Sequence, residues 1–382
     1  MDYTCPLCGN KDPKYFGYRN GKIYCRRCIS FHGEMASEAI LSLNKNKFFK
    51  ANISYTLSQE QEEISLKILE GFKRKKNTLV YAVCGAGKTE LVFKVIEYAL
   101  KKGGHVGFAI PRKDVVIELR ERLAKTFDKN KVIALYGGHN NELTGDIIVL
   151  TTHQLYRYEH YFDLLILDEI DAFPYKDNPT LEALFKRSIK GNYVMMSATP
   201  SKRIIDEFNS PSHQILKLFH RYHKNPLPLP KVKIEFLIFK YIFLIKKLKE
   251  FIKQDKPVLV FTPTIKESES LFSIVRIFLK GGNVVHSKKE DRPEIISDFR
   301  ERKYKFLITT SVLERGVTLS NLQVIIFHSD HYLYTSSALI QISGRVGRVK
   351  DFPKGEIIYI ASKKTKEMEE SIETINGYNK DL

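Results

Sequence analysis

The chain has 382 residues, of which 43% are hydrophobic and 12% aromatic, so it is long enough for two or three globular domains. No apolar run approaches the roughly 18 residues of a membrane-spanning helix, and the N-terminus lacks the basic and apolar regions of a secretory signal, which together predict a cytosolic protein. The net charge is +18, and residues 211–382 alone carry 30 basic and 19 acidic residues. This excess of positive charge predicts a polyanionic partner such as nucleic acid. A general bias of the composition toward lysine is the alternative explanation.

Four cysteines near the N-terminus form two Cys-x-x-Cys pairs: Cys5, Cys8, Cys25 and Cys28. In a cytosolic protein such pairs are typical of metal ligands, and four thiolates make a closed tetrahedral zinc site. The sixteen intervening residues suit a short hairpin that turns at Asn20-Gly21 and depends on the metal for its folding energy. We therefore predict a structural zinc module at residues 1–33, with a redox role as the alternative. Its mixture of basic and aromatic residues suits a nucleic-acid surface or an ordinary solvated hairpin equally well.

Residues 34–56 are predicted to be a linker. The next segment opens with Leu57-Ser58-Gln59-Glu60-Gln61 and places apolar residues at helical spacing. Ser58 and Gln61 are three residues apart, which is the pattern of a capping box and a structural explanation for Gln61.

The strongest functional signal is the stretch from Ala82 to Thr89, which reads Ala-Val-Cys-Gly-Ala-Gly-Lys-Thr. It follows an apolar run of strand length and precedes a segment with helical periodicity. Gly85 and Gly87 lack a Cβ, so the backbone N–H groups around Ala86 can close on phosphate oxygens. The helix start adds the positive end of its dipole, and the stretch therefore predicts a phosphate-binding loop.

Two side chains at the end of this loop carry the expected chemistry. Lys88 would reach the terminal phosphates of a nucleotide, and the hydroxyl of Thr89 would bind magnesium. The usual pattern begins with glycine where this chain has Ala82, so a glycine-rich turn with an incidental lysine is the alternative.

Five or more apolar runs of strand length alternate with helical segments, which predicts a parallel-sheet domain at residues 57–210. One run, Leu164 to Leu167, leads directly into Asp168-Glu169-Ile170-Asp171 and so places acids at the carboxyl end of a buried strand, where α/β sheets bind ligands. Asp168 would hold magnesium and Glu169 would orient an attacking water. Capping of the following helix is the alternative, but it explains a cluster of acids poorly.

The second half of the chain repeats this plan without a phosphate loop. Residues 211–230 include a proline-rich stretch and are predicted to be a linker. Residues 231–382 again alternate strands and helices, which predicts a second parallel-sheet domain. A predicted helix from Ser336 to Val346 carries Gln341 and Arg345 and leads to Arg348, so this half offers arginines in place of a phosphate loop.

The order of these blocks resembles superfamily 2 helicases over about residues 57–361. The resemblance implies an α/β fold with two tandem RecA-like parallel-sheet domains behind the small zinc-binding module, and in that family alanine is usual at the first loop position. It also implies that Gln61 reads adenine, that Gly316 and Gln341 take part in nucleotide binding, and that Arg345 and Arg348 act as arginine fingers. ATP and magnesium are the implied cofactors.

The same resemblance implies a path for nucleic acid along the strand ends. Pro111-Arg112 resembles motif Ia, Thr151 to Gln154 resembles motif Ib, and Thr310 to Thr318 resembles motif V. The residues expected to hold the sugar-phosphate chain are Arg112, Thr151, Thr152, Thr262 and Thr310. Such contacts carry little sequence information.

Three more specific features resemble the ComFA family of late-competence ATPases of transformable Gram-positive bacteria. They are the cysteine module in front of the two predicted parallel-sheet domains, the acidic stretch from Asp168 to Tyr175, and the stretch from Leu313 to Thr318. The resemblance implies a translocase or helicase that drives single-stranded transforming DNA into the cytosol with ATP, Mg²⁺ and Zn²⁺. Its implied partners are a membrane entry channel and a phosphoribosyltransferase-like competence protein, with peripheral docking at the inner face of the cell membrane. Typical members carry a longer leader before the cysteines.

Two alternatives are weighed against this function. A repair or replication-restart helicase of the PriA branch also combines a motor with zinc, but it places its cysteines within the second half of the motor. A non-enzymatic zinc-ribbon protein that binds DNA is the other, and the intact Lys88, Asp168, Glu169, Arg345 and Arg348 argue against it.

Overall fold

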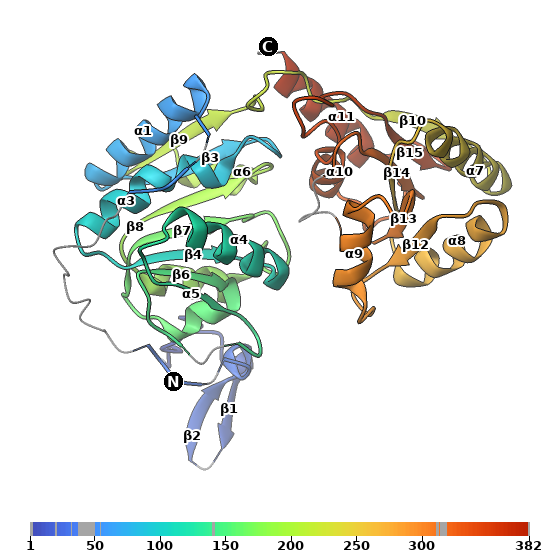
Figure 1. Cartoon of the computed structure of the whole chain (residues 1–382). Coiled ribbons are helices and arrows are strands. Elements are labelled where there is room, and N and C mark those ends of the chain that lie inside the picture. Colours follow the sequence, from blue (N-terminus) through green and yellow to red (C-terminus); the bar gives the residue numbers. More distant parts are fainter. Residues whose placement is uncertain are drawn as a thin grey trace. The chain divides into compact units, whose positions relative to one another are not determined.

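The computed structural model divides the chain into two compact units (Figure 1). The first unit comprises residues 1–82 and 87–218, and the second comprises residues 83–86 and 219–382. The described residues are 3–19, 21–31, 33–36, 50–53, 55–139, 142–310, 313 and 319–380. Within them, every helix is too short or too polar to cross a bilayer.

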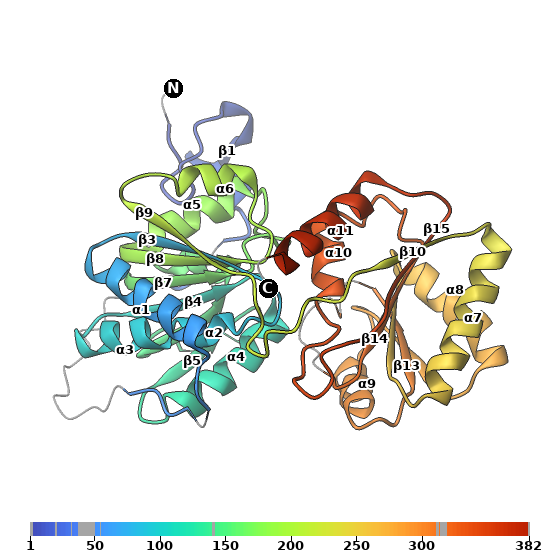
Figure 2. The same cartoon turned by 90° about the horizontal axis from the view of Figure 1, so that it is seen from above.

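The first unit is built on a seven-stranded sheet in which all neighbouring strands are parallel. In order across the sheet, the strands are β5 (Val132–Leu135), β6 (Ile147–Thr151), β4 (Val106–Ile110), β7 (Phe162–Asp168), β8 (Ile189–Ser197), β3 (Asn77–Ala82) and β9 (His213–Leu218). The central strands are apolar on both faces because helices cover both sides. Figure 2 shows α1 (Gln59–Lys73), α3 (Phe93–Lys101) and α4 (Lys113–Thr126) on one face and α5 (Pro179–Ser188) and α6 (Lys202–Glu207) on the other.

The first sheet extends beyond residue 210, where the sequence predicted its end. Strand β9 pairs with β3 from Asn77 opposite His213 to Ala82 opposite Leu218. It is an edge strand whose residues are mostly half-buried, so it lacks the continuous apolar run that identified the inner strands. The predicted linker therefore begins too early.

The second unit is built on a six-stranded parallel sheet, which confirms the predicted second α/β domain. Its strands, in order, are β10 (Lys231–Ile234), β15 (Ile357–Ala361), β14 (Gln323–Phe327), β11 (Val258–Phe261), β13 (Phe306–Thr309) and β12 (Gly282–Val285). Helices α7 (Leu237–Lys253) and α8 (Ile265–Phe278) pack on one face, and α9 (Arg292–Arg300), α10 (Ser336–Ser343) and α11 (Lys366–Asn379) lie on the other (Figure 1).

The cysteine-rich N-terminus folds as the predicted antiparallel hairpin, formed by β1 (Phe16–Arg19) and β2 (Lys22–Cys25). Gly17 faces Tyr24 across the hairpin, and a Cβ at residue 17 would lie 2.5 Å from the Tyr24 ring, so the ring can lie across the strand only because the residue is glycine. Gly21 has a φ of +73°, as a tight turn requires, whereas Asn20 lies outside the described residues. Leu7 and Phe31 pack on the core of the first unit, so the module is part of that unit.

Candidate functional site

The phosphate loop has the predicted strand–loop–helix form. Strand β3 ends at Ala82, and helix α2 (Lys88–Leu91) begins after Gly87. Gly85 and Gly87 have φ angles of +85° and +78°, a region that residues with a Cβ rarely adopt. A Cβ at Gly87 would also lie 2.5 Å from Nε2 of Gln61, so this position requires glycine for both its backbone and its space. Lys88 and Thr89 follow at the helix start and are half-buried.

Gln61 has the structural role that its spacing from Ser58 predicts. The N–H of Ser58 donates to Oε1 of Gln61 at 2.9 Å, and the N–H of Gln61 donates to Oγ of Ser58 at 3.3 Å. The capping box is therefore confirmed, and it uses the amide oxygen of Gln61. The amide nitrogen of the same side chain lies beside Gly87. Adenine recognition by Gln61 stays a prediction.

The acidic residues lie where the sequence places them, at the carboxyl end of β7. Asp168 is the last residue of the strand, and its Oδ1 accepts the N–H of Glu169 at 2.8 Å. Glu169 has a φ of +59°, a left-handed backbone that costs a non-glycine residue about 1–2 kcal/mol. In the sheet, β8 lies between β7 and β3, so these acids and the phosphate loop follow strands at the same edge.

The structure adds a link that the motifs alone do not reveal. Asp171 accepts two hydroxyl hydrogen bonds, from Ser197 at 3.0 Å and from Thr199 at 2.7 Å. Ser197 ends β8, so these bonds connect the acidic loop to the neighbouring strand. The acidic loop and residues 197–199 are therefore tied together by side-chain hydrogen bonds.

A second link fixes the short helix that carries Lys88. Glu90 is 9% exposed and accepts hydrogen bonds from the Arg122 guanidinium and, at 2.8 Å, from the Tyr55 hydroxyl. Burial lowers the pKa of Arg122. This ion pair, between a buried carboxylate and a partly exposed guanidinium, holds α2 against α4, and the sequence offers no signal for it because the two residues are 32 positions apart.

In the second unit, Gln341 and Arg345 are buried, with 4% and 1% exposure. Helix α10 ends at Ser343, earlier than predicted, so Arg345 and Arg348 lie on the turn that follows it. The Nε of Arg348 donates to the carbonyl of Gly344 at 2.8 Å. Gly316 lies outside the described residues, as does most of the motif V stretch.

A buried arginine from the predicted linker supports this turn. Arg221 is 2% exposed and donates to the carbonyls of Gly344, Val346 and Gly347 at 3.0, 2.7 and 2.5 Å. Burial and the neighbouring Arg348 charge lower the pKa of Arg221 to about 9, which leaves it charged at neutral pH. Nothing in the local sequence around Arg221 marks it as a functional residue.

The residues expected to hold nucleic acid follow strand ends, as predicted, but most of their side chains are buried. Thr151 is 7% exposed, Thr152 is fully buried and Thr310 is 8% exposed. Thr262 is 1% exposed, and its hydroxyl donates to backbone carbonyls of its own unit. The hydroxyls of Thr152 and Thr262 are enclosed in the fold in this conformation, so the predicted contacts with nucleic acid at these two residues would have to come from backbone N–H groups. Arg112 is half-buried at the start of α4, and the backbone N–H groups of these turns stay available as a prediction.

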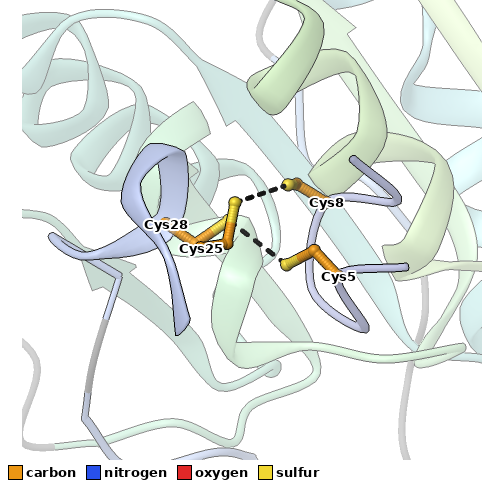
Figure 3. Close-up of side chains that lie close together, drawn as sticks. All are labelled: Cys5, Cys8, Cys25 and Cys28. Carbon is orange, nitrogen blue, oxygen red and sulfur yellow. Dashed lines mark hydrogen bonds between the residues drawn. The ribbon is translucent and has the colours of Figure 1, made fainter. Parts of the chain in front are cut away.

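The four N-terminal cysteines converge on one point (Figure 3). Their sulfurs all lie within 4.8 Å of one another, with Sγ–Sγ distances of 3.8 Å for Cys5 to Cys28 and 3.9 Å for Cys8 to Cys25. A tetrahedral ion with Zn–S bonds of about 2.3 Å requires S–S separations of about 3.8 Å, so the donor set and its spacing fit zinc. Burial raises the pKa of the Cys8 thiol to about 11, so ion binding must release protons.

Comparisons with known proteins agree with this architecture. Residues 54–202 match a family described as type III restriction enzyme, res subunit, and residues 242–350 match the helicase conserved C-terminal domain. The fold is similar to that of S. cerevisiae Dbp5 bound to RNA and ADP BeF3, with a TM-score of 0.61 and 18% identity over 85% of this chain and 92% of that one.

Two curated relatives are similar over nearly the full length of the chain. Competence protein ComFA of Bacillus subtilis is 35% identical over 99% of this chain and 86% of the relative. Competence protein ComFA of Streptococcus pneumoniae is 34% identical over 94% of this chain and 87% of the relative. Together with the two-domain fold and the sites described above, this similarity shows that the chain belongs to the ComFA family of superfamily 2 helicases.

Proposed function

We propose that this protein is an ATP-dependent single-stranded DNA translocase that drives the import of transforming DNA during natural competence. The observation that carries the proposal is membership of the ComFA family together with an intact phosphate loop and acidic loop at one edge of a parallel sheet. ATP is the energy source and DNA is the track. The excess of basic residues suits a polyanionic partner.

The assignment of roles follows from the side chains present. Backbone N–H groups of residues 85–87 cradle the phosphates, and Lys88 neutralises their terminal charge. Thr89 and Asp168 would hold magnesium, which supplies charge neutralisation at the phosphates when bound. Glu169 orients the attacking water. Arg345 and Arg348 neutralise the charge that develops on the transferred phosphoryl group.

Hydrolysis can be coupled to movement because these residues come from two units. Lys88 belongs to the first unit, whereas Arg345 and Arg348 belong to the second. Rapid hydrolysis is therefore expected only when the units close on a nucleotide, and product release allows them to open. Each such cycle would shift one unit along the DNA strand. Contacts with the sugar-phosphate chain suffice for this, because import must accept any sequence.

The decisive measurement is the ATPase rate of the purified full chain with magnesium and with single-stranded DNA, duplex DNA or RNA. Single-stranded DNA is expected to raise the rate of ATP hydrolysis several-fold. The DNA concentration that gives half of this stimulation should rise steeply with salt concentration, because the contacts are made to phosphates. An ATPase rate that single-stranded DNA leaves unchanged would overturn the proposal. Robust unwinding of forked duplexes with little stimulation by single strands would favour the restart-helicase alternative.

Two partners follow from the family resemblance and stay predictions. One is the membrane channel through which DNA enters, and the other is a phosphoribosyltransferase-like competence protein. Peripheral docking at the inner face of the membrane belongs to the same prediction.

We also propose that the ion bound by Cys5, Cys8, Cys25 and Cys28 is a structural zinc. Cys25→Ser removes one of four thiolates and is expected to lower the zinc content below half of the wild-type value and to expose the N-terminus to proteolysis. The measurements are metal content by atomic absorption and limited proteolysis of the full chain. Cys84→Ser, a change at the cysteine of the phosphate loop, is the matched control and should keep its zinc. Unchanged zinc in Cys25→Ser would refute the four-thiolate site.

A further inference from the structure

The segment that leaves the cysteine module packs on the short helix η3 (Thr152–Arg157) of the first unit. The Phe31 ring stacks on the His153 ring, with centroids 6.1 Å apart, and lies 5.8 Å from the Tyr156 ring. The N–H of Ala36 donates to the carbonyl of Arg157 at 2.9 Å. Residues 31 and 33–36 together with η3 form what we call the joint.

Arg157 is the centre of the joint. Its side chain is 4% exposed, its Nη1 donates to the carbonyl of Glu34 at 2.6 Å, and its Nε donates to Oε1 of Gln154 at 2.7 Å. Its guanidinium also lies 4.8 Å from the centre of the Tyr156 ring. A buried guanidinium with partners in both the module segment and η3 fixes the position of each relative to the other.

Gly33 permits the close approach on the module side. Its φ is +141°, and a Cβ there would lie 2.8 Å from the Tyr156 hydroxyl and 3.1 Å from Nη2 of Arg157. Any larger residue must strain its backbone and push these two side chains aside. The contact therefore depends on a specific residue in the module segment as well as on Arg157.

The joint also reaches the metal ligands. The N–H of Phe31 donates to the carbonyl of Cys28 at 2.9 Å, so the residue that stacks on His153 is hydrogen-bonded to a zinc ligand. At the other end, η3 follows β6 directly, so the motif Ib stretch runs from the last residue of β6, Thr151, into residues 152–154 of η3. Because Thr151 and Thr152 are buried, phosphate contact at this turn would depend on the backbone of the helix on which the joint is built.

We infer that the joint makes single-stranded DNA binding depend on metal occupancy of the cysteine module, with Arg157 as the positioning residue. An ion held by four thiolates fixes Cys28, Cys28 fixes Phe31, and Phe31 together with Arg157 fixes the η3 backbone against the sugar-phosphate chain. The inference rests on the proposed function, because it takes η3 as a contact with DNA. Since coupling is reciprocal, DNA should also slow the loss of zinc to a chelator.

The test compares zinc-loaded and chelator-treated full-length protein. The readouts are the dissociation constant for fluorescein-labelled oligothymidylate and the DNA concentration that half-maximally stimulates ATP hydrolysis. Removal of zinc from the wild type should raise both the dissociation constant and the half-maximally stimulating DNA concentration by about 5-fold or more, which is the lower range of allosteric couplings. The maximal stimulated rate should change much less, because the nucleotide site is not altered.

Two variants break the joint from opposite sides. Arg157→Gln removes the guanidinium, and Gly33→Ala pushes the module segment away without changing any residue of η3. Each should retain zinc, bind DNA as weakly as the zinc-free wild type, and lose no further affinity on chelation. The basal ATPase rate of Gly33→Ala should equal that of the wild type. Arg203→Gln is the matched control, since Arg203 pairs with Glu182 at the surface of the same unit. In this variant, removal of zinc should weaken DNA binding as much as it does in the wild type.

Three results would overturn the inference. One is wild-type DNA affinity that zinc removal leaves unchanged. Another is a zinc effect in both joint variants as large as in the wild type, which would mean that the module touches DNA itself. Zinc-loaded wild type that binds no single-stranded DNA would overturn the proposed function and, with it, the inference.

Discussion

Lys88→Ala and Glu169→Gln are each expected to lower the rate of ATP hydrolysis by about 10²–10³-fold, the effect typical of removing one charge-stabilising group, while leaving single-stranded DNA binding nearly intact. The two variants should fail for different reasons. Lys88→Ala loses the cation that neutralises the terminal phosphates, so nucleotide affinity should fall as well. Glu169→Gln keeps the phosphate loop and should still bind ATP, because only the group that orients the attacking water has changed.

Steady-state ATPase assays, nucleotide binding by a fluorescent ATP analogue and DNA binding by anisotropy separate these effects. Lys101→Ala and Glu63→Gln are matched controls, because both side chains are exposed on helices of the same unit, and both should behave as wild type. If both Lys88→Ala and Glu169→Gln lost DNA binding, the assigned nucleotide site would be a DNA site. Full activity of Lys88→Ala would revive the non-enzymatic alternative.

The geometry of the proposed nucleotide-binding loops could be predicted because their signals are local. The phosphate loop lies between one strand and one helix, and the acids follow an apolar run directly, so the strand–loop–helix form and the edge of the sheet could be inferred from short stretches. The cysteines are a similar case, since each Cys-x-x-Cys pair is local and the hairpin between the pairs has a turn signal. In both cases the residues that act together are close in sequence or follow strands at the same edge of one sheet.

The supporting contacts could not be predicted because their partners are distant and chemically ordinary. Arg221 is 126 residues from Gly347, and its partners are backbone carbonyls, which any residue type supplies. Arg157 binds a carbonyl 123 residues away. The buried threonines are a further case: a motif predicts contact with nucleic acid at a position, and only the packed structure shows that the hydroxyl there is enclosed and that the backbone N–H groups would have to make the contact.

Arg221→Met is expected to lower the maximal ATPase rate by about 10²-fold or more, although Arg221 is assigned no contact with the nucleotide. Hydrogen bonds from a charged donor contribute roughly 1.5–3 kcal/mol each, and this variant leaves three carbonyls of the arginine-bearing turn without that donor. Arg348 shares the Gly344 carbonyl with Arg221, so its guanidinium should lose its orientation when Arg221 is removed. Arginine fingers are worth about 10³–10⁵-fold in rate, which is enough to account for the loss.

A double-mutant cycle distinguishes positioning of Arg348 from a general loss of stability. If Arg221 acts through the turn, Arg221→Met and Arg348→Ala should be strongly non-additive, and the double variant should be little slower than Arg348→Ala alone. In Arg348→Ala, affinity for an ATP analogue should change much less than the maximal rate, because the phosphate-binding Lys88 and Thr89 are unaltered. The two variants without Arg221 also lose the donor to the Cys84 carbonyl of the phosphate loop, so some loss of nucleotide affinity is expected in them. Arg276→Met, at an exposed arginine of α8, is the matched control. Additive losses would show that Arg221 contributes independently of Arg348, and the turn would then have to be held by its remaining contacts alone.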